Sequence, residues 1–427
     1  MDYRVALTPE ELAMLKGECG AAKQKAIEVI VRFADALGAE SLCEITKAQI
    51  FVGAHHYLDV LDSDDIDEVI SALYLTSDEV VSLDQLSVFT QSDATPLDPE
   101  RWRAMDVAED RFKKDCRYRD RLYGSGMAAG DSCASYLTGF VPLMGEHYVS
   151  TESHALLFMN SLWGACTNAG SIETSICAAF CGRTPYWGLH IKENRRGTHL
   201  VTVKTNPKSV RDWDLLGYAI GEELPANAIP VIVGKFERPR VEHLKSMFAS
   251  MATSGTAELC HIVGITPEAP TLEQAFAGQT PDAQITIDDA QIRAVRRTVS
   301  ASGCDKLYFV SLGCPHYTLE QIQQVAEWLN GKKVHEDVVL RVWTAPGLKN
   351  SADRSGFTAM IEAAGGQLLT STCPLVSETV PQVPAMAFDS MKQARYVGLG
   401  TAAKVFCGSV QECLESAVVG IWKGTDS

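Results

Sequence analysis

Apolar residues recur at two different spacings along the chain, and each spacing predicts a different kind of element. Between residues 23 and 37 they return every three or four positions, which places them on one face of a helix that Gly38 would end. Another helix is expected near the N-terminus, where Thr8 precedes a proline and two glutamates. Residues 228–234 instead form a short, nearly continuous apolar run, which is typical of a buried strand.

The two kinds of element alternate through the second half of the chain. We expect strands at 199–204, 228–234, 259–264, 306–311, 338–344 and 367–369, and helices at 210–216, 241–254, 288–300, 319–329 and 351–364. In the first half we expect strands at 42–52 and 79–83 and helices at 63–75 and 99–123. Strands that alternate with helices form parallel sheets with helices on their faces. The pattern therefore predicts an α/β fold.

The character of the chain changes near residues 125 and 235, which suggests three lobes. Residues 1–125 would form a mostly helical N-terminal lobe. Residues 126–235 would form an α/β lobe that carries most of the site, because Gly, Ser, Thr, Asn, Cys and His gather in its first half. Residues 236–427 would form a C-terminal α/β lobe with two Cys-Pro turns. A length of 427 residues agrees with two or three domains.

Charge narrows the classes of partner. The chain has 38 Lys and Arg against 54 Asp and Glu, a net charge of -16. A surface of this sign repels phosphate backbones and anionic lipids, so we expect neither nucleic-acid nor membrane binding. No apolar run reaches the length of a membrane span. A small-molecule substrate is the better expectation.

Cysteine is the most informative residue type, with 13 copies. The number is odd and no signal segment opens the sequence, so we expect reduced thiols in a cytoplasmic protein. Most such cysteines are small core residues, and we assign Cys177, Cys181, Cys407 and Cys413 to the core. The remaining task is to find the minority that carries chemistry.

Two cysteines follow predicted strands and precede prolines. Cys314-Pro315 comes after the strand at 307–311, and Cys373-Pro374 comes after the strand at 366–369. Ligands of parallel α/β folds bind at the carboxyl ends of strands, and a proline there would stop the strand and leave the thiol at an open turn. Cys133 lies in a third small polar turn.

Three cysteines on separate loops suit an iron–sulfur cluster in which one iron has no protein thiolate and acts as a Lewis acid. In an alternative interpretation these thiols only pack in the interior. Another is a metal-free enzyme in which Cys314 is a thiolate nucleophile beside His316. The paired C-x-x-C spacing of a zinc ribbon is absent from the sequence.

Polar groups that could orient a substrate gather after the Cys133 turn. Carboxylate, hydroxyl and amide groups surround a predicted helix, and cationic groups occur in a later loop and near the C-terminus. The candidates are Glu152, Ser153, Asn160, Asn168, His190, Arg195 and Lys392.

The order and spacing of the short motifs resemble the large, catalytic chain of the aconitase X family. The motifs are Asp131-Ser132-Cys133-Ala134-Ser135-Tyr136, Gly145-Glu146-His147, Glu152-Ser153, Asn160-Ser161, Thr167-Asn168, Gly182-Arg183-Thr184-Pro185, Gly188-Leu189-His190, Glu193-Asn194-Arg195, Gly313-Cys314-Pro315-His316, Thr372-Cys373-Pro374 and Ser390-Met391-Lys392-Gln393-Ala394-Arg395-Tyr396. Each motif is weak alone, but the ordered set spans nearly the whole chain.

The resemblance implies an aconitase-like fold and a cytoplasmic hydro-lyase whose iron–sulfur cluster is held by Cys133, Cys314 and Cys373. Whether the cluster is 2Fe-2S, 3Fe-4S or 4Fe-4S stays open. Glu152, Ser153 and Lys392 are the expected catalytic residues, and Asn160, Asn168, His190 and Arg195 are the expected substrate-binding residues. The family also uses a small swivelling domain, which we expect here as a separate partner subunit.

Members of the family dehydrate cis-3-hydroxy-L-proline or mevalonate 5-phosphate. Residues 172–196 resemble bacterial two-chain members, which favours cis-3-hydroxy-L-proline and the product Δ1-pyrroline-2-carboxylate. Mevalonate 5-phosphate or a related hydroxy acid is the alternative. Cys166 stands where the family usually has an arginine, and the loss of an arginine that binds the acid or phosphate group of the substrate would imply a substrate other than these two. A degenerate subunit that binds a partner without turnover is the non-enzymatic alternative.

Overall fold

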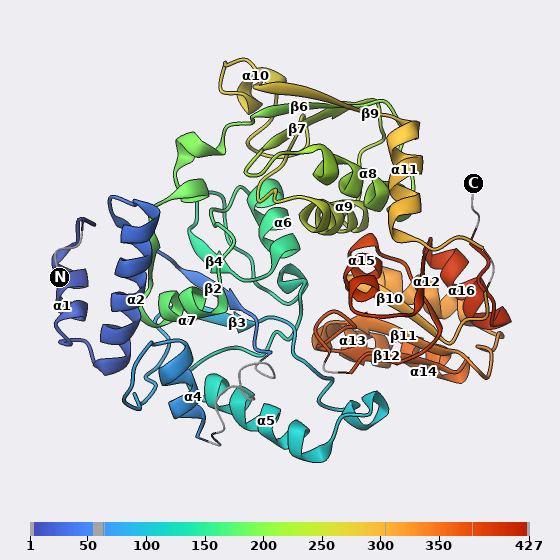
Figure 1. Cartoon of the computed structure of the whole chain (residues 1–427), viewed down its shortest axis with the longest axis horizontal. Coiled ribbons are helices and arrows are strands. Elements are labelled where there is room, and N and C mark those ends of the chain that lie inside the picture. The colour runs from blue at the N-terminus through green and yellow to red at the C-terminus, as the bar shows by residue number, and fades with distance from the viewer. Residues whose placement is uncertain (1–3, 54–62, 64, 304, 378, 425–427) are drawn as a thin grey trace.

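The computed structural model of the chain describes residues 4–53, 63, 65–303, 305–377 and 379–424 (Figure 1). Its largest sheet has five parallel strands in the order β12-β11-β10-β13-β14. These strands are β10 (Phe309–Tyr317), β11 (Val339–Thr344), β12 (Gly366–Thr370), β13 (Ala385–Phe388) and β14 (Lys404–Cys407). Every residue of β10 is buried, as expected for a central strand covered on both faces.

A second parallel sheet has the order β8-β7-β6-β9, formed by β6 (His199–Val203), β7 (Pro230–Gly234), β8 (His261–Ile262) and β9 (Ala283–Ile287). A third has the order β3-β2-β4, formed by β2 (Lys47–Ile50), β3 (Phe89–Ser92) and β4 (Tyr148–Ser150). Two short strands, β1 (Leu42–Glu44) and β5 (Arg183–Pro185), pair antiparallel. Parallel sheets flanked by helices confirm the predicted α/β class.

Helices separate and cover these sheets (Figure 1). They are α1 (Pro9–Leu15), α2 (Ala21–Leu37), α4 (Ile66–Leu73), α5 (Glu109–Gly124), α6 (Ser153–Trp163), α7 (Ile172–Cys181), α8 (Val210–Glu223), α9 (Val241–Ser254), α10 (Leu272–Ala275), α11 (Asp289–Val299), α12 (Leu319–Leu329), α13 (Pro346–Arg354), α14 (Phe357–Ala363), α15 (Met391–Leu399) and α16 (Val410–Val419). Four short 3₁₀ turns are η1 (Trp102–Met105), η2 (Ser135–Leu137), η3 (Gly188–His190) and η4 (Lys192–Arg195).

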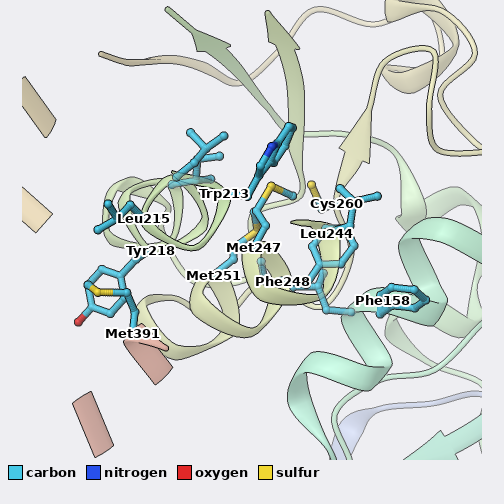
Figure 2. Close-up of a cluster of buried hydrophobic side chains, with 14 of the residues drawn as sticks. Phe158, Trp213, Leu215, Tyr218, Leu244, Met247, Phe248, Met251, Cys260 and Met391 are labelled. Atoms are coloured by element: carbon cyan, nitrogen blue, oxygen red, sulfur yellow. The ribbon is translucent and has the colours of Figure 1, made fainter. Parts of the chain in front are cut away.

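The core between two of the sheets is built on α8 and α9, which pack along each other. Figure 2 shows Trp213 of α8 beside Met247 of α9, and Tyr218 of α8 beside Met391. Met391, the first residue of α15, reaches the same cluster. Since α15 also packs on β13 and β14, this core holds α9 and α15 against the five-stranded sheet.

Some elements differ from the pattern-based expectation. The strand predicted at 79–83 is absent: these residues form a loop in which Val81 and Leu83 are buried. The prediction that proline ends the strand before Cys314 was also wrong. The strand β10 continues to Tyr317, with a register irregularity between Leu312 and Tyr317 that contains Cys314.

The sheets cross both borders that the sequence suggested for the lobes. The β3-β2-β4 sheet takes strands from both sides of residue 125, and the β8-β7-β6-β9 sheet takes strands from both sides of residue 235. The three-lobe division stays a prediction. None of the helices in the described ranges combines the length and apolar character that crossing a bilayer requires.

Candidate active site

The structure brings Cys133, Cys314 and Cys373 together from three separate segments. Cys133 lies in the loop before η2, Cys314 in the irregular part of β10, and Cys373 three residues after β12. Burial raises the pKa of the Cys133 thiol, and the charges of Glu152, Cys373 and Cys314 raise it further. Burial and the Cys373 thiol likewise raise the pKa of Cys314. The three thiols are therefore electrostatic neighbours in one largely buried site.

His316 ties the loops of the three cysteines together. Its Nδ1 lies 3.0 Å from the Ser132 hydroxyl, and its Nε2 lies 3.0 Å from the Thr372 carbonyl oxygen. Ser132 and Thr372 directly precede Cys133 and Cys373 in the sequence. Burial lowers the pKa of His316 to about 4, so the ring is neutral at pH 7. Both ring nitrogens are thus used to fix the geometry of the site.

Lys245 supports the segment around Cys314 from the neighbouring helix α9. Its Nζ donates to the carbonyl oxygens of Pro315, at 2.9 Å, and of His316, at 2.7 Å. The side chain is fully buried, and burial lowers the pKa of Lys245 to about 8. A backbone segment that carries Cys314 is therefore held by a buried ammonium group.

An ion pair borders the cysteines. Nζ of Lys392, at the start of α15, lies 2.7 Å from Oε1 of Glu152, which caps α6, and 3.3 Å from the Ser153 hydroxyl. The same Glu152 oxygen accepts from Nδ1 of His154 at 2.7 Å. Burial acts to raise the pKa of Glu152, but Lys392 and His154 outweigh it and hold that pKa well below its usual range. Glu152 is therefore a carboxylate at neutral pH.

Asp93 is a second carboxyl group at the same place. It follows β3 and is 2% exposed. Burial and the charge of Glu152 raise the pKa of Asp93 well above its usual value, which favours its protonated form. Its segment is tied to the Cys373 loop, because the amide of Thr95 donates to the carbonyl oxygen of Ser371 at 2.7 Å. The pKa values of these two neighbouring carboxyl groups are thus shifted in opposite directions.

The four residues expected to bind substrate form a separate group, and their side chains form hydrogen bonds and an ion pair with other residues of the protein. Arg195 pairs with Glu268, with 2.9 Å between Nε and Oε1, and also donates to the carbonyl oxygen of Asn160. Asn160 bonds to the backbone of Thr167 through both amide atoms. Their role in substrate binding stays a prediction.

The other two residues of that group are also held by neighbours. Asn168 donates to the carbonyl oxygen of Trp187 and accepts from the amide of Leu189. Nδ1 of His190 lies 3.0 Å from Nδ1 of His147. Lys392 contacts Glu152 and Ser153, and these three residues form one polar cluster. Among the described residues, no other member of the expected catalytic and substrate-binding set contacts Lys392 in this way.

The geometry does not favour Cys314 as a free nucleophile. An activated thiolate needs a lowered pKa, whereas burial raises the pKa of Cys314. His316 is not available as its base, since Ser132 and Thr372 occupy its ring nitrogens. The predicted core cysteines Cys177, Cys181, Cys407 and Cys413 are buried, which confirms that assignment.

Sequence reasoning missed Asp93 and Lys245. Asp93 is a polar residue directly after β3, but no strand was predicted at 89–92, so this signal was not available from the sequence. Lys245 gave no such signal, since a lysine between apolar residues of a helix is ordinarily a solvent-facing position. Its burial results from packing of α9 against β10.

Comparisons with known proteins agree on one family. Models described as the first, second and third domains of aconitase X match residues 4–193, 197–297 and 307–419. A phosphomevalonate dehydratase large subunit of Methanothermobacter thermautotrophicus is 32% identical over 395 residues, which cover 92% of this chain and 94% of that protein. A cis-3-hydroxy-L-proline dehydratase of Pseudomonas aeruginosa is 30% identical over 417 residues, 96% of this chain and 69% of that protein.

The fold agrees as well. A crystal structure of Thermococcus kodakaraensis aconitase X in its holo-form superposes with a TM-score of 0.81. It is 28% identical in sequence, and the match covers 97% of this chain and 100% of that chain.

Proposed function

The chain belongs to the aconitase X family of hydro-lyases, and we propose that it dehydrates cis-3-hydroxy-L-proline to Δ1-pyrroline-2-carboxylate with an iron–sulfur cluster held by Cys133, Cys314 and Cys373. The observation that carries the proposal is the meeting of these three thiols beside the Glu152–Lys392 ion pair. The thiols and the ion pair provide, respectively, soft metal ligands and charged groups for an amino acid.

The cysteine site fits such a cluster by the chemistry of its donors. Thiolates are the ligands of iron–sulfur clusters, and here three free thiols come from separate segments without a disulfide between them. Their raised pKa values mean that the thiols are protonated in the free protein, so metal loading would release protons. The buried hydroxyl of Thr372, beside Cys373, lacks a hydrogen-bond partner within the described part of the chain, as a group facing an inorganic sulfide would.

The polar residues match the charges of a zwitterionic amino acid. Lys392 has three N–H donors, of which Glu152 and Ser153 engage two among the described residues, so one is left for a substrate carboxylate. Oε1 of Glu152 accepts from Lys392 and His154, which leaves Oε2 to accept from the ring ammonium of hydroxyproline. A bound cluster would supply Lewis-acidic iron for the departing hydroxyl. Asp93, in its protonated form, would donate a proton to that hydroxyl.

Mevalonate 5-phosphate is the second candidate substrate. It is favoured by the match to phosphomevalonate dehydratase large subunits, which extends over 94% of their length in two of them. A substrate with a carboxylate and a phosphate calls for several cations, whereas Lys392 is already paired with Glu152. This difference in charge is the reason for preferring cis-3-hydroxy-L-proline to mevalonate 5-phosphate as the proposed substrate.

We also propose a small partner subunit and a cytoplasmic location. The relatives named large subunits support the partner. The twelve cysteines in the described part of the chain are all free thiols, which supports a reducing compartment.

The proposal is tested by anaerobic purification of the chain, with and without a co-expressed small-subunit candidate. Iron, acid-labile sulfide and the visible spectrum are measured, and both substrates are then followed by NMR, with trans-3-hydroxy-L-proline as a stereochemical control. We expect bound iron and sulfide that are lost in Cys133→Ser, Cys314→Ser and Cys373→Ser and kept in Cys19→Ser, an exposed thiol. A colourless, iron-free protein from anaerobic cells would contradict the cluster. Turnover of the phosphate ester alone would favour the second candidate.

A further inference from the structure

A second group of metal-binding side chains lies outside the cysteine site. Cys43 of β1, His147 directly before β4, and His190 at the end of η3 each offer one donor atom, and these atoms all lie within 4.8 Å of one another. The group shares no residue with the proposed cluster site. Its members are 104 and 43 residues apart in the sequence, so the fold alone brings them together.

The backbone around these residues is well anchored. Cys43 is held in the β1–β5 pair opposite Thr184. His147 forms a β-bridge with Cys166, and its carbonyl oxygen accepts from the amide of Thr46 at 3.0 Å. The amide of His190 donates to the carbonyl oxygen of Trp187. The donors are therefore presented from fixed segments, as a preformed metal site requires.

The two imidazoles of the group lie close to each other. Nδ1 of His147 lies 3.0 Å from Nδ1 of His190, close to the separation of two nitrogens that share one metal ion. His147 and Cys43 are partly exposed, which gives an ion a route in from solvent.

The donor atoms of the group are nitrogen and sulfur. Two nitrogens and one sulfur form a donor set of borderline softness. Hard cations such as Mg²⁺ and Ca²⁺ prefer oxygen, and none of these donors is oxygen.

We propose that Cys43, His147 and His190 bind a Zn²⁺ ion. Zinc accepts this combination of thiolate and imidazole in a tetrahedral arrangement and needs no redox partner. The ion would tie β1 to the start of β4 and to η3, and so would join the N-terminal segment to the loop that follows β5. His190 is then a zinc ligand and not a substrate contact, and the inference does not depend on the identity of the substrate.

The test measures zinc and iron separately in the full-length protein. We expect about one zinc per chain after growth with added zinc and gel filtration. Cys43→Ser, His147→Asn and His190→Asn should each weaken zinc retention at least tenfold, in the range found for lost metal ligands and their supports. Cys116→Ser, at a thiol of similar partial exposure outside the group, should keep the zinc.

Cobalt gives a readout that does not rely on activity. Co²⁺ added to the zinc-free protein should produce the visible bands of a tetrahedral site and a thiolate charge-transfer band. These bands should disappear in Cys43→Ser and persist in Cys314→Ser, which separates this site from the proposed cluster. Zinc retained in Cys43→Ser, or a correctly folded wild-type chain that binds neither ion, would overturn the proposal. In that case the two histidines share only a hydrogen bond.

If a variant fails to fold, the wild-type chain still decides the matter. Zinc that binds the folded state raises the melting temperature as its free concentration increases. The Cys133→Ser variant should show the same rise, since its altered thiol lies in the other site. Absence of the rise in both proteins would overturn the proposal.

Discussion

Nε2 of His316 lies 3.0 Å from the carbonyl oxygen of Thr372, and this contact determines the tautomer of the ring. A carbonyl oxygen only accepts, so Nε2 carries the proton. Nδ1 of the neutral ring then accepts from the hydroxyl of Ser132. Since Ser132 and Thr372 adjoin Cys133 and Cys373, a neutral His316 holds the three cysteine loops at fixed positions, whereas a protonated ring could not accept from Ser132.

Acid should therefore destabilise the protein through His316. The pKa of this ring is about 4 in the folded chain against about 6.5 when unfolded. The contribution of the neutral ring to the free energy of unfolding is fully present above pH 6.5 and is lost as the pH falls toward 4. In that range the unfolded chain takes up a proton on this histidine and the folded chain does not. The loss amounts to about 3 kcal/mol of the free energy of unfolding. Urea unfolding of wild type and His316→Gln at pH 7 and pH 4.5 measures it.

Wild type and His316→Gln must be compared because other groups also titrate between pH 4.5 and pH 7. Asp389, whose pKa is raised to about 6 mainly by burial, contributes a slope of opposite sign. We expect the stability advantage of the wild type to shrink toward pH 4.5. His335→Gln, at a partly exposed histidine, is the matched control variant. Parallel curves for wild type and His316→Gln would contradict the interpretation.

The Glu152–Lys392 pair should be more costly to break than to remove. Each single variant, Glu152→Gln or Lys392→Met, leaves one charge in a largely buried position, and we expect each to lower the free energy of unfolding by about 3 kcal/mol. The double variant should recover part of that loss, which urea unfolding of all four proteins would measure. All three variants should lose at least about a hundredfold in kcat. Additive losses of stability would show that the pair is not coupled.

The sequence predicted the helices with strong terminal signals most closely. The helix at 319–329 agrees with α12 at both ends, because Thr318 and Gln321 form a capping box. The helix at 241–254 also agrees with α9. By contrast, β13 and β14 were not predicted. They are strands of only four residues within the C-terminal segment, and their pairing with the rest of the sheet supplies the signal that the local pattern lacks.

The site was predictable in its parts but not in its assembly. The three cysteines could be selected because each lies in a polar or proline-containing segment at the end of a strand or between elements. Asp93 could not be given a role, since its protonation depends on burial against Glu152, 59 residues away in the sequence. Cys43 gave no signal at all. Only the folded chain places it beside His147 and His190.

Asp93 should be replaceable by asparagine with little effect on folding. A protonated carboxyl and an amide have nearly the same shape, and the side-chain oxygen in Asp93→Asn could still accept from the amide of Ala94, as the carboxyl oxygen does in the wild type. We expect an unchanged or higher free energy of unfolding at pH 7, because the buried carboxyl group no longer resists ionisation. Activity should fall about a hundredfold through loss of the proton donor.

The pH dependence of kcat distinguishes this role from a structural one. In the wild type, activity should decline on the alkaline side as Asp93 loses its proton, and the Asp93→Asn variant should lack that decline. A variant with full activity would exclude Asp93 as the proton donor. A loss of several kcal/mol in stability would instead show that Asp93 is ionised and paired.

Gly313 is the position where a single added methyl group should disturb the cluster site. Its φ is +105°, and a Cβ there would lie 2.5 Å from the carbonyl oxygen of Trp343 on β11. The backbone of β10 would have to move away from β11, and Cys314 is the next residue. We expect Gly313→Ala to lower the free energy of unfolding by at least about 2 kcal/mol and to reduce bound iron. Gly347→Ala, in α13 with no atom within 4 Å of the added Cβ, should be neutral or stabilising and keep its iron. Normal iron binding by Gly313→Ala would mean that the irregular segment of β10 can shift without displacing the Cys314 thiol.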